Sequence, residues 1–338
     1  MQDDLHEAML WKPAAEGAVD CSLCAHRCHI GPGQRGVCRV RENQDGRLLS
    51  LVYGRVIANH VDPIEKKPLF HFLPGSRAYS IATVGCNFQC GFCQNWQISQ
   101  WPRSAAGEMP GEPLGPDDVV AEARRTGCAS ISYTYTEPTV FFEYARDCGV
   151  LARQAGLRNT FVTNGYMTPQ AIDAMAPWLD AANVDLKAWD DAFYRTVCKA
   201  RVEPVKESIR RMHDLGIWVE VTTLLVPGRN DDPDGLKGIS GFLAAISPDM
   251  PWHVTRYHPD FEMRQPPATP PESIELALRI GREAGLKYVY AGNIAGMQDT
   301  VCPACGKTVI ERQGMGVAQT RLRGAACGFC GTSLPIVV

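Results

Sequence analysis

Cysteines are the residues of this chain whose number and spacing most directly suggest chemistry. The sequence has 14 of them, and most fall into three close-set groups, here named N-terminal, central and C-terminal. In that order, the groups are Cys21, Cys24, Cys28 and Cys38; Cys86, Cys90 and Cys93; and Cys302, Cys305, Cys327 and Cys330. Pairs separated by two residues form strained disulfides, and the acidic N-terminus lacks the basic and apolar regions of a secretory signal. We therefore expect a cytoplasmic protein whose thiolates bind metal ions or clusters.

The central group lies in TVGCNFQCGFCQNW (83–96) and has the spacing Cys-x3-Cys-x2-Cys. Three thiolates on one short loop can hold three irons of a cubane cluster and leave the fourth iron open to a ligand. Structural zinc usually takes four protein ligands, so a trio fits zinc poorly. The spacing therefore favours a redox-active 4Fe–4S cluster over a zinc site or a chance grouping.

The two outer groups each offer four thiolates. The N-terminal group suits either a structural zinc or an auxiliary 4Fe–4S cluster, and its regular spacing argues against a reduced set without a metal. The C-terminal group forms two knuckles, CPACG and CGFCG, which are typical of a zinc ribbon or of a rubredoxin-like iron site. A metal there would supply folding free energy to a segment with a small core. The single cysteines Cys128, Cys148 and Cys198 are expected to be buried free thiols.

The elements that position these groups alternate between strand and helix from Ala78 to about Asn293. Strands are predicted at 78–84, 129–135, 158–163, 181–187, 217–226, 252–257 and 287–292, and helices at 116–127, 141–156, 203–216 and 271–285. Repeated βα units favour an α/β fold with a parallel sheet, closed into a partial or full TIM-like barrel whose active site lies at the carboxyl ends of the strands. The chain then divides into a Cys-rich N-terminal extension (1–77), a core barrel (78–298) and a zinc-ribbon or rubredoxin-like tail (299–338).

Composition limits the function further. Of the 338 residues, 45% are hydrophobic and 21% are charged, and the net charge is −3. A protein that binds duplex nucleic acid usually carries a basic excess. No apolar run reaches the length of a membrane span. We therefore expect neither a membrane protein nor a nucleic-acid-binding protein.

The motif Cys-x3-Cys-x-aromatic-Cys, placed after the first barrel strand, resembles the radical S-adenosylmethionine (SAM) superfamily. The resemblance implies a partial (β/α)6-type barrel in which Cys86, Cys90 and Cys93 ligate the cluster and SAM binds the open iron. It also implies that one electron cleaves SAM to methionine and a 5′-deoxyadenosyl radical, which abstracts hydrogen from a substrate. A flavodoxin or ferredoxin would be the reductant.

Polar and aromatic residues at other strand ends carry further expectations from this resemblance. The residues expected to contact SAM are Phe92, Glu137, Asn164, Asp185, Lys187 and His258. Phe92 would meet the adenine, and the carboxylate of Glu137 would pair with the SAM ammonium group. The structural alternatives are packing for Phe92, a helix-dipole interaction for Glu137, a solvated ion pair for Asp185 and Lys187, and a structural role for His258.

Longer segments are similar to the AmmeMemoRadiSam radical SAM enzymes, which are related to pyruvate formate-lyase activating enzymes. The segments are 21–43, 62–75, 132–144, 163–166, 185–189 and the cysteine-containing tail. The resemblance implies an oxidoreductase that abstracts hydrogen from a small molecule or from a protein glycine, and a Memo-like partner in the same pathway. The short activases lack such a tail. A non-catalytic zinc-ribbon or iron–sulfur electron carrier is the alternative, but it leaves the strand-end residues unexplained.

Overall fold

An eight-stranded sheet forms the centre of the computed structural model, which describes residues 6–104 and 108–338. The strand order is β16-β15-β14-β13-β12-β11-β9-β8. Neighbouring strands from β9 to β16 are parallel, and β8 pairs antiparallel with β9. The strands are β8 (Ala58–Pro63), β9 (Arg77–Ala82), β11 (Ser130–Tyr133), β12 (Arg158–Thr163), β13 (Ala181–Asp185), β14 (Trp218–Leu225), β15 (Trp252–Arg256) and β16 (Val289–Gly292).

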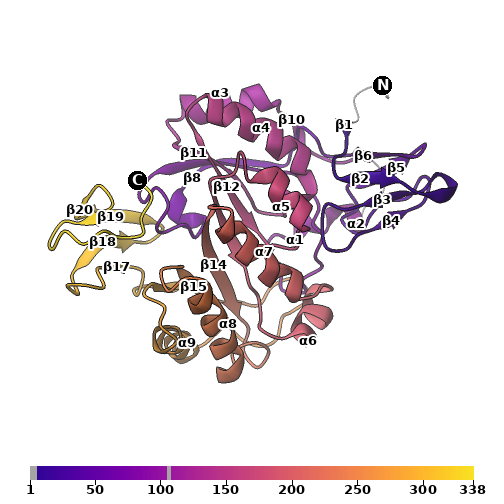
Figure 1. The fold of residues 1–338 in the computed structure, drawn as a ribbon. Coiled ribbons are helices and arrows are strands. Elements are labelled where there is room, and N and C mark those ends of the chain that lie inside the picture. The colour runs from indigo at the N-terminus through magenta and orange to yellow at the C-terminus, as the bar shows by residue number, and fades with distance from the viewer. Residues whose placement is uncertain (1–5, 105–107) are drawn as a thin grey trace.

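Helices connect the parallel strands and lie along one face of the sheet (Figure 1). The helices are α1 (Trp96–Ser99), α2 (Trp101–Ser104), α3 (Pro116–Arg125), α4 (Phe142–Gln154), α5 (Pro169–Met175), α6 (Asp191–Phe193), α7 (Glu203–Asp214), α8 (Pro233–Ile246) and α9 (Pro271–Glu283). Helix α3 shows why such segments are helical. It starts with proline, has acidic residues in its first turn and basic residues in its last, and so complements the helix dipole.

The parallel strands from β9 to β16 are mostly buried on both faces, because helices cover one face and side chains pack the interior of the barrel on the other. Ile131, Val184, Val221 and Val254 are fully buried at the centre of four strands. Every strand predicted between 78 and 292 is present, with ends that differ by a few residues. The predicted α/β fold with a partial parallel barrel is therefore confirmed. Strand β8, which lies in the segment predicted to be an N-terminal extension, adds an antiparallel edge to this sheet.

Two small cysteine-containing regions flank the sheet on opposite sides (Figure 1). The N-terminal region contains β1 (His6–Glu7), β2 (Trp11–Pro13), β3 (Val19–Cys21), β4 (His29–Ile30), β5 (Arg41–Gln44), β6 (Arg47–Ser50) and β7 (Arg55–Val56), the last of which pairs with β10 (Glu112–Pro113). The tail contains β17 (Thr300–Val301), β18 (Thr308–Gln313), β19 (Gly316–Thr320), β20 (Leu322–Arg323) and β21 (Ala326–Cys327).

The tail packs against the segment that joins β8 to β9. A ring nitrogen of His71, Nδ1, hydrogen-bonds the carbonyl oxygen of Pro335 at 2.9 Å, and the Val337 amide donates to the His71 carbonyl at 2.8 Å. The Arg312 guanidinium donates to the Phe70 carbonyl at 2.7 Å and lies over the Phe70 ring. These contacts fix the tail at the amino-terminal side of the barrel, because Phe70 and His71 also bind Glu220 near the start of β14.

Candidate cluster and cofactor site

The central cysteines occupy the loop between β9 and α1, at the carboxyl end of a barrel strand. Gly85 precedes Cys86 with φ of 100°, a backbone conformation that favours glycine. The loop then turns so that Cys86 and Cys90 are buried while Cys93 is partly exposed. The carboxyl ends of parallel strands are where barrel enzymes place their active sites.

The three central thiols act on one another through space. Burial, followed by the charges of Glu137, Cys90 and Cys93, raises the pKa of Cys86 well above its usual range. Burial and the Cys90 thiol also raise the pKa of Cys93. Neutral thiols are therefore favoured until iron binds, and loading the site should release protons.

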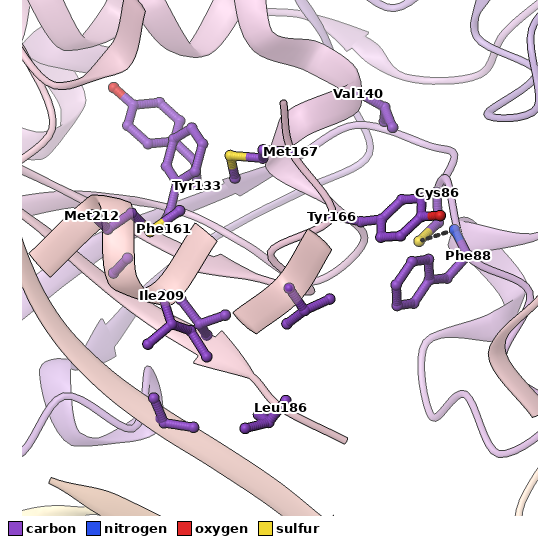
Figure 2. Packing of buried hydrophobic residues seen from close by; sticks show 14 of the residues in the cluster. Cys86, Phe88, Tyr133, Val140, Phe161, Tyr166, Met167, Leu186, Ile209 and Met212 are labelled. Atoms are coloured by element: carbon purple, nitrogen blue, oxygen red, sulfur yellow. Dashed lines mark hydrogen bonds between the residues drawn. The ribbon is translucent and has the colours of Figure 1, made fainter. Parts of the chain in front are cut away.

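Hydrogen-bond donors surround the central sulfurs. The Phe88 amide donates to Cys86 Sγ at 3.3 Å, and Figure 2 shows this bond beside the rings of Phe88 and Tyr166. The side-chain amide nitrogen of Asn164, Nδ2, also donates to Cys86 Sγ, at 3.8 Å. The hydroxyl of Ser99 lies 3.3 Å from Cys93 Sγ. Donors of this kind tune the potential of an iron–sulfur cluster.

Asp185 ends β13, Lys187 follows it, and both reach the central loop. Lys187 Nζ donates to Asp185 Oδ2 at 2.8 Å and lies 5.6 Å from the centroid of the Phe92 ring. Burial alone would lower the pKa of Lys187, but Asp185 and the thiols of Cys90 and Cys198 raise it well above its usual range. The structure therefore brings the predicted Phe92, Asp185 and Lys187 together, with a stable positive charge next to the Cys90 thiol.

Glu137 is fully buried and its carboxylate is occupied by donors. It accepts hydrogen bonds from the amide and hydroxyl of Thr139 at 3.0 and 2.5 Å, from the Thr163 hydroxyl at 2.6 Å and from the Asn164 amide at 2.8 Å. Burial raises its pKa despite these bonds. The contacts are those of a residue that positions the turn at Asn164, whose side chain then meets Asn87 and Cys86. A contact between Glu137 and SAM stays a prediction.

His258 follows β15 and is exposed. Its Nε2 lies 2.9 Å from the side-chain amide nitrogen, Nε2, of Gln94, the residue after Cys93. The predicted histidine is thus next to the central loop, although its contact with SAM also stays a prediction.

Two residues at the site were not assigned from sequence. Cys198 is buried, and a hydrogen bond to Cys198 is the largest cause that raises the pKa of Cys90. Asn87 accepts from the Asn164 side chain at 2.7 Å through its Oδ1, and its backbone carbonyl meets His26 Nε2 at 2.8 Å. The position of Asn87 inside the cysteine motif could have suggested a role. Cys198 follows the strand that contains Lys187 and could therefore face the cavity, but without geometry the sequence assigns it no role.

The C-terminal cysteines form a compact site. The sulfurs of Cys302 and Cys330 are 3.7 Å apart and those of Cys305 and Cys327 are 3.8 Å apart. A tetrahedral ion with metal–sulfur bonds of about 2.3 Å separates its ligands by about 3.8 Å. The site therefore fits a single zinc or iron ion.

Comparison with known proteins agrees with this fold. Residues 80–236 match the family model of the Radical SAM superfamily. The chain is 42% identical to the uncharacterized protein MJ0808 of Methanocaldococcus jannaschii over 339 residues, which cover 99% of this chain and 100% of that protein. It belongs to the radical SAM superfamily. Among residues 6–104 and 108–338, no helix has the length and apolar character needed to cross a membrane.

Solved structures with low sequence identity share the fold. A radical SAM methyltransferase from Sphaerobacter thermophilus matches with a TM-score of 0.52 and 18% identity, over 67% of this chain and 69% of its own. Streptococcus suis SuiB bound to S-adenosylmethionine matches with a TM-score of 0.52 and 12% identity, over 69% of this chain and 53% of its own. These likenesses concern the fold alone.

Proposed function

We propose that this protein is an oxidoreductase that cleaves SAM reductively and abstracts a hydrogen atom from its substrate, as an activase does. The observation that carries the proposal is the convergence of Asp185, Lys187 and Phe92 on the central thiols at the carboxyl ends of the strands. Three thiolates suit a 4Fe–4S cluster with one open iron, which would supply one-electron chemistry when bound.

The residues of the chain would position the reactants. The thiols of Cys86, Cys90 and Cys93 would hold three irons, and the Lys187 ammonium would offset their negative charge at Cys90. Glu137 fixes the turn that points Asn164 at Cys86. Burial of Cys86 and Cys90 limits the access of water, which strengthens these electrostatic interactions.

The wider assignments are part of the same proposal. The substrate is a small molecule or a protein glycine, the reductant is a flavodoxin or ferredoxin, and a Memo-like protein is a partner in the pathway. The tail holds a mononuclear zinc or iron, for which the sulfur distances of 3.7 and 3.8 Å are the support. The protein acts in the cytoplasm.

The test is SAM cleavage by anaerobic protein that has been reconstituted with iron and sulfide and reduced with dithionite. We expect 5′-deoxyadenosine and methionine from the wild type, none from Cys93→Ala, and unchanged yield from Cys128→Ala, which removes a buried thiol outside the three groups. Formation of S-adenosylhomocysteine without 5′-deoxyadenosine would favour methyl transfer. A loaded, reduced cluster that leaves SAM intact would overturn the proposal in favour of an electron carrier.

A further inference from the structure

The spacing of sulfur atoms distinguishes the three cysteine groups. In the part of the chain that the structure describes, the C-terminal group is the one set of three or more His, Cys, Asp or Glu side chains whose ligand atoms all lie within 4.8 Å of one another. Neither the N-terminal nor the central group places three sulfurs that close within the same residues. The N-terminal group therefore resembles the central group, and differs from the group that fits a mononuclear ion.

The four N-terminal thiols nevertheless face a common space. Cys21, Cys24 and Cys38 are buried and Cys28 is partly buried. Burial is the main cause that raises the pKa of Cys24, and the thiols of Cys21, Cys38 and Cys28 raise it further. Burial likewise raises the pKa of Cys38 to about 11, with contributions from Cys21 and Cys28. The thiols converge, but they are spread wider than a single tetrahedral ion requires.

We propose that Cys21, Cys24, Cys28 and Cys38 bind a second 4Fe–4S cluster. A cubane needs this wider spacing, because its irons and sulfides lie between the cysteine sulfurs. Four thiolates would occupy all four irons, so this cluster would have no open iron for SAM. Electron transfer is the chemistry that it would supply.

The surroundings of the N-terminal sulfurs suit a charged group. The Val37 amide donates to Cys28 Sγ at 3.4 Å, and Arg41 Nη1 donates to Cys21 Sγ at 3.4 Å. Arg41 is fully buried and pairs with the buried Glu143. A buried guanidinium at this place would offset part of the negative charge of four thiolates.

The N-terminal group is held directly against the central loop. His26 Nε2 lies 2.8 Å from the Asn87 carbonyl oxygen. A Cβ placed on Gly85 would lie 3.4 Å from the carbonyl oxygen of Cys38. The backbone of Cys38 therefore lies beside Gly85, the residue before Cys86, whereas the tail lies across the barrel (Figure 1).

This placement suits a relay of single electrons and, in that respect, rests on the proposed function. A low-potential ferredoxin or flavodoxin would lose one electron, and the cluster on the central cysteines would gain it. No bond forms or breaks in this transfer, and no proton moves. The second cluster would shorten the distance of each electron-transfer step between the protein surface and the central loop.

The first experiment measures metal content and does not depend on activity. The variant Cys86→Ala/Cys90→Ala/Cys93→Ala should retain about four irons and four sulfides per chain after anaerobic reconstitution, against about eight of each in the wild type, with one further iron in both proteins if the tail binds iron. Its reduced form should give the electron paramagnetic resonance signal of a 4Fe–4S cluster, unchanged by SAM. A variant that holds no iron and about two zinc ions, one in each outer group, would overturn the proposal.

The second experiment removes the N-terminal ligands with Cys24→Ser/Cys38→Ser and uses Cys128→Ser as the control. We expect loss of about four irons, an intact signal that responds to SAM, and 5′-deoxyadenosine formation with dithionite. With reduced flavodoxin or ferredoxin, formation of 5′-deoxyadenosine should fall at least about tenfold.

Full iron content in this variant would contradict the second cluster, and an undiminished rate with the protein donors would contradict the relay. If this variant does not fold, the iron content of the triple variant decides. Absence of a SAM response in the wild type would instead reject the proposed function and leave the iron counts valid.

Discussion

Glu137 illustrates how a single buried residue supports the site through its hydrogen bonds to neighbouring residues. Its carboxylate accepts four hydrogen bonds, and two of them come from Thr163 and Asn164 at the end of β12. Hydrogen bonds to a charged acceptor are stronger than neutral ones, and a buried donor left without a partner is costly. The position of the Asn164 side chain next to Cys86 therefore depends on this carboxylate.

Replacing Glu137 by Gln should lower the free energy of unfolding by roughly 2–4 kcal/mol, because the Gln side chain places an N–H donor where a carboxylate oxygen accepts a hydrogen bond. Anaerobic urea denaturation of the apoprotein measures this change. Glu207→Gln, on the exposed surface of α7, is the matched control and should change stability by no more than about 0.5 kcal/mol. Equal effects of the two substitutions would show that Glu137 does not brace the turn.

At the scale of elements, the end of β9 joins the barrel to the N-terminal region. Gly85 adopts a φ of 100°, and a Cβ on it would lie 2.6 Å from Val40 Cγ1. Such a contact is closer than carbon atoms tolerate, so the loop and the segment around Val40 can pack only around a glycine. The packing of these two segments brings the N-terminal and central groups together.

Substituting Ala for Gly85 should destabilise the protein by more than the same change at Gly156. Gly156 also has a positive φ, of 78°, but a Cβ there meets nothing within 4 Å, so its cost should be the backbone strain of about 1–2 kcal/mol. Gly85→Ala adds a clash with Val40 to this strain. The Gly85→Ala change should therefore cost less stability when it is made in the Val40→Ala variant than when it is made in the wild type. Thermal or urea unfolding gives the four stabilities. If Gly85→Ala and Gly156→Ala cost the same stability, the Val40 side chain would have moved aside without a cost.

At the scale of the whole molecule, the two outer cysteine regions occupy opposite sides of the barrel and have different physical roles. The tail has a small core of Cys302, Val309, Ile310, Cys327, Leu334 and Ile336. A core of this size rarely folds without a metal. The tail is held to the barrel through Arg312 and His71, far from the central loop (Figure 1).

Loss of the metal proposed for the tail, through Cys305→Ser, should therefore unfold the tail and spare the cluster proposed for the central cysteines. Trypsin should cleave after Arg321 and Arg323 at least about tenfold faster, which corresponds to a loss of about 1.4 kcal/mol or more in local stability. The SAM response of the central cluster should persist, and Cys128→Ser should leave both properties unchanged. Metal loss without faster cleavage would show that packing alone folds the tail.

Much of the architecture could be predicted from sequence because its causes are local. The strand and helix periodicities between 78 and 292 depend on neighbouring side chains, and the trio Cys86, Cys90 and Cys93 lies on one short loop. The superfamily and the α/β barrel followed from these features, and the matches to known proteins bear both out. The C-terminal cysteine group was also visible as two local knuckles, whose sulfurs the structure brings together.

The sequence alone determined which residues carry chemistry, and the tertiary structure decided how they act on one another. The sequence left the N-terminal group open between zinc and a cluster. The two differ in the distances between the sulfurs, and these distances depend on how the loops between the cysteines fold. It could not place Cys198 beside Cys90, nor show that Glu137 is fully occupied by hydrogen bonds, since these contacts join segments far apart in the chain. It also gave no sign that β8 extends the sheet, because an edge pairing depends on which strand is left free after the barrel has formed.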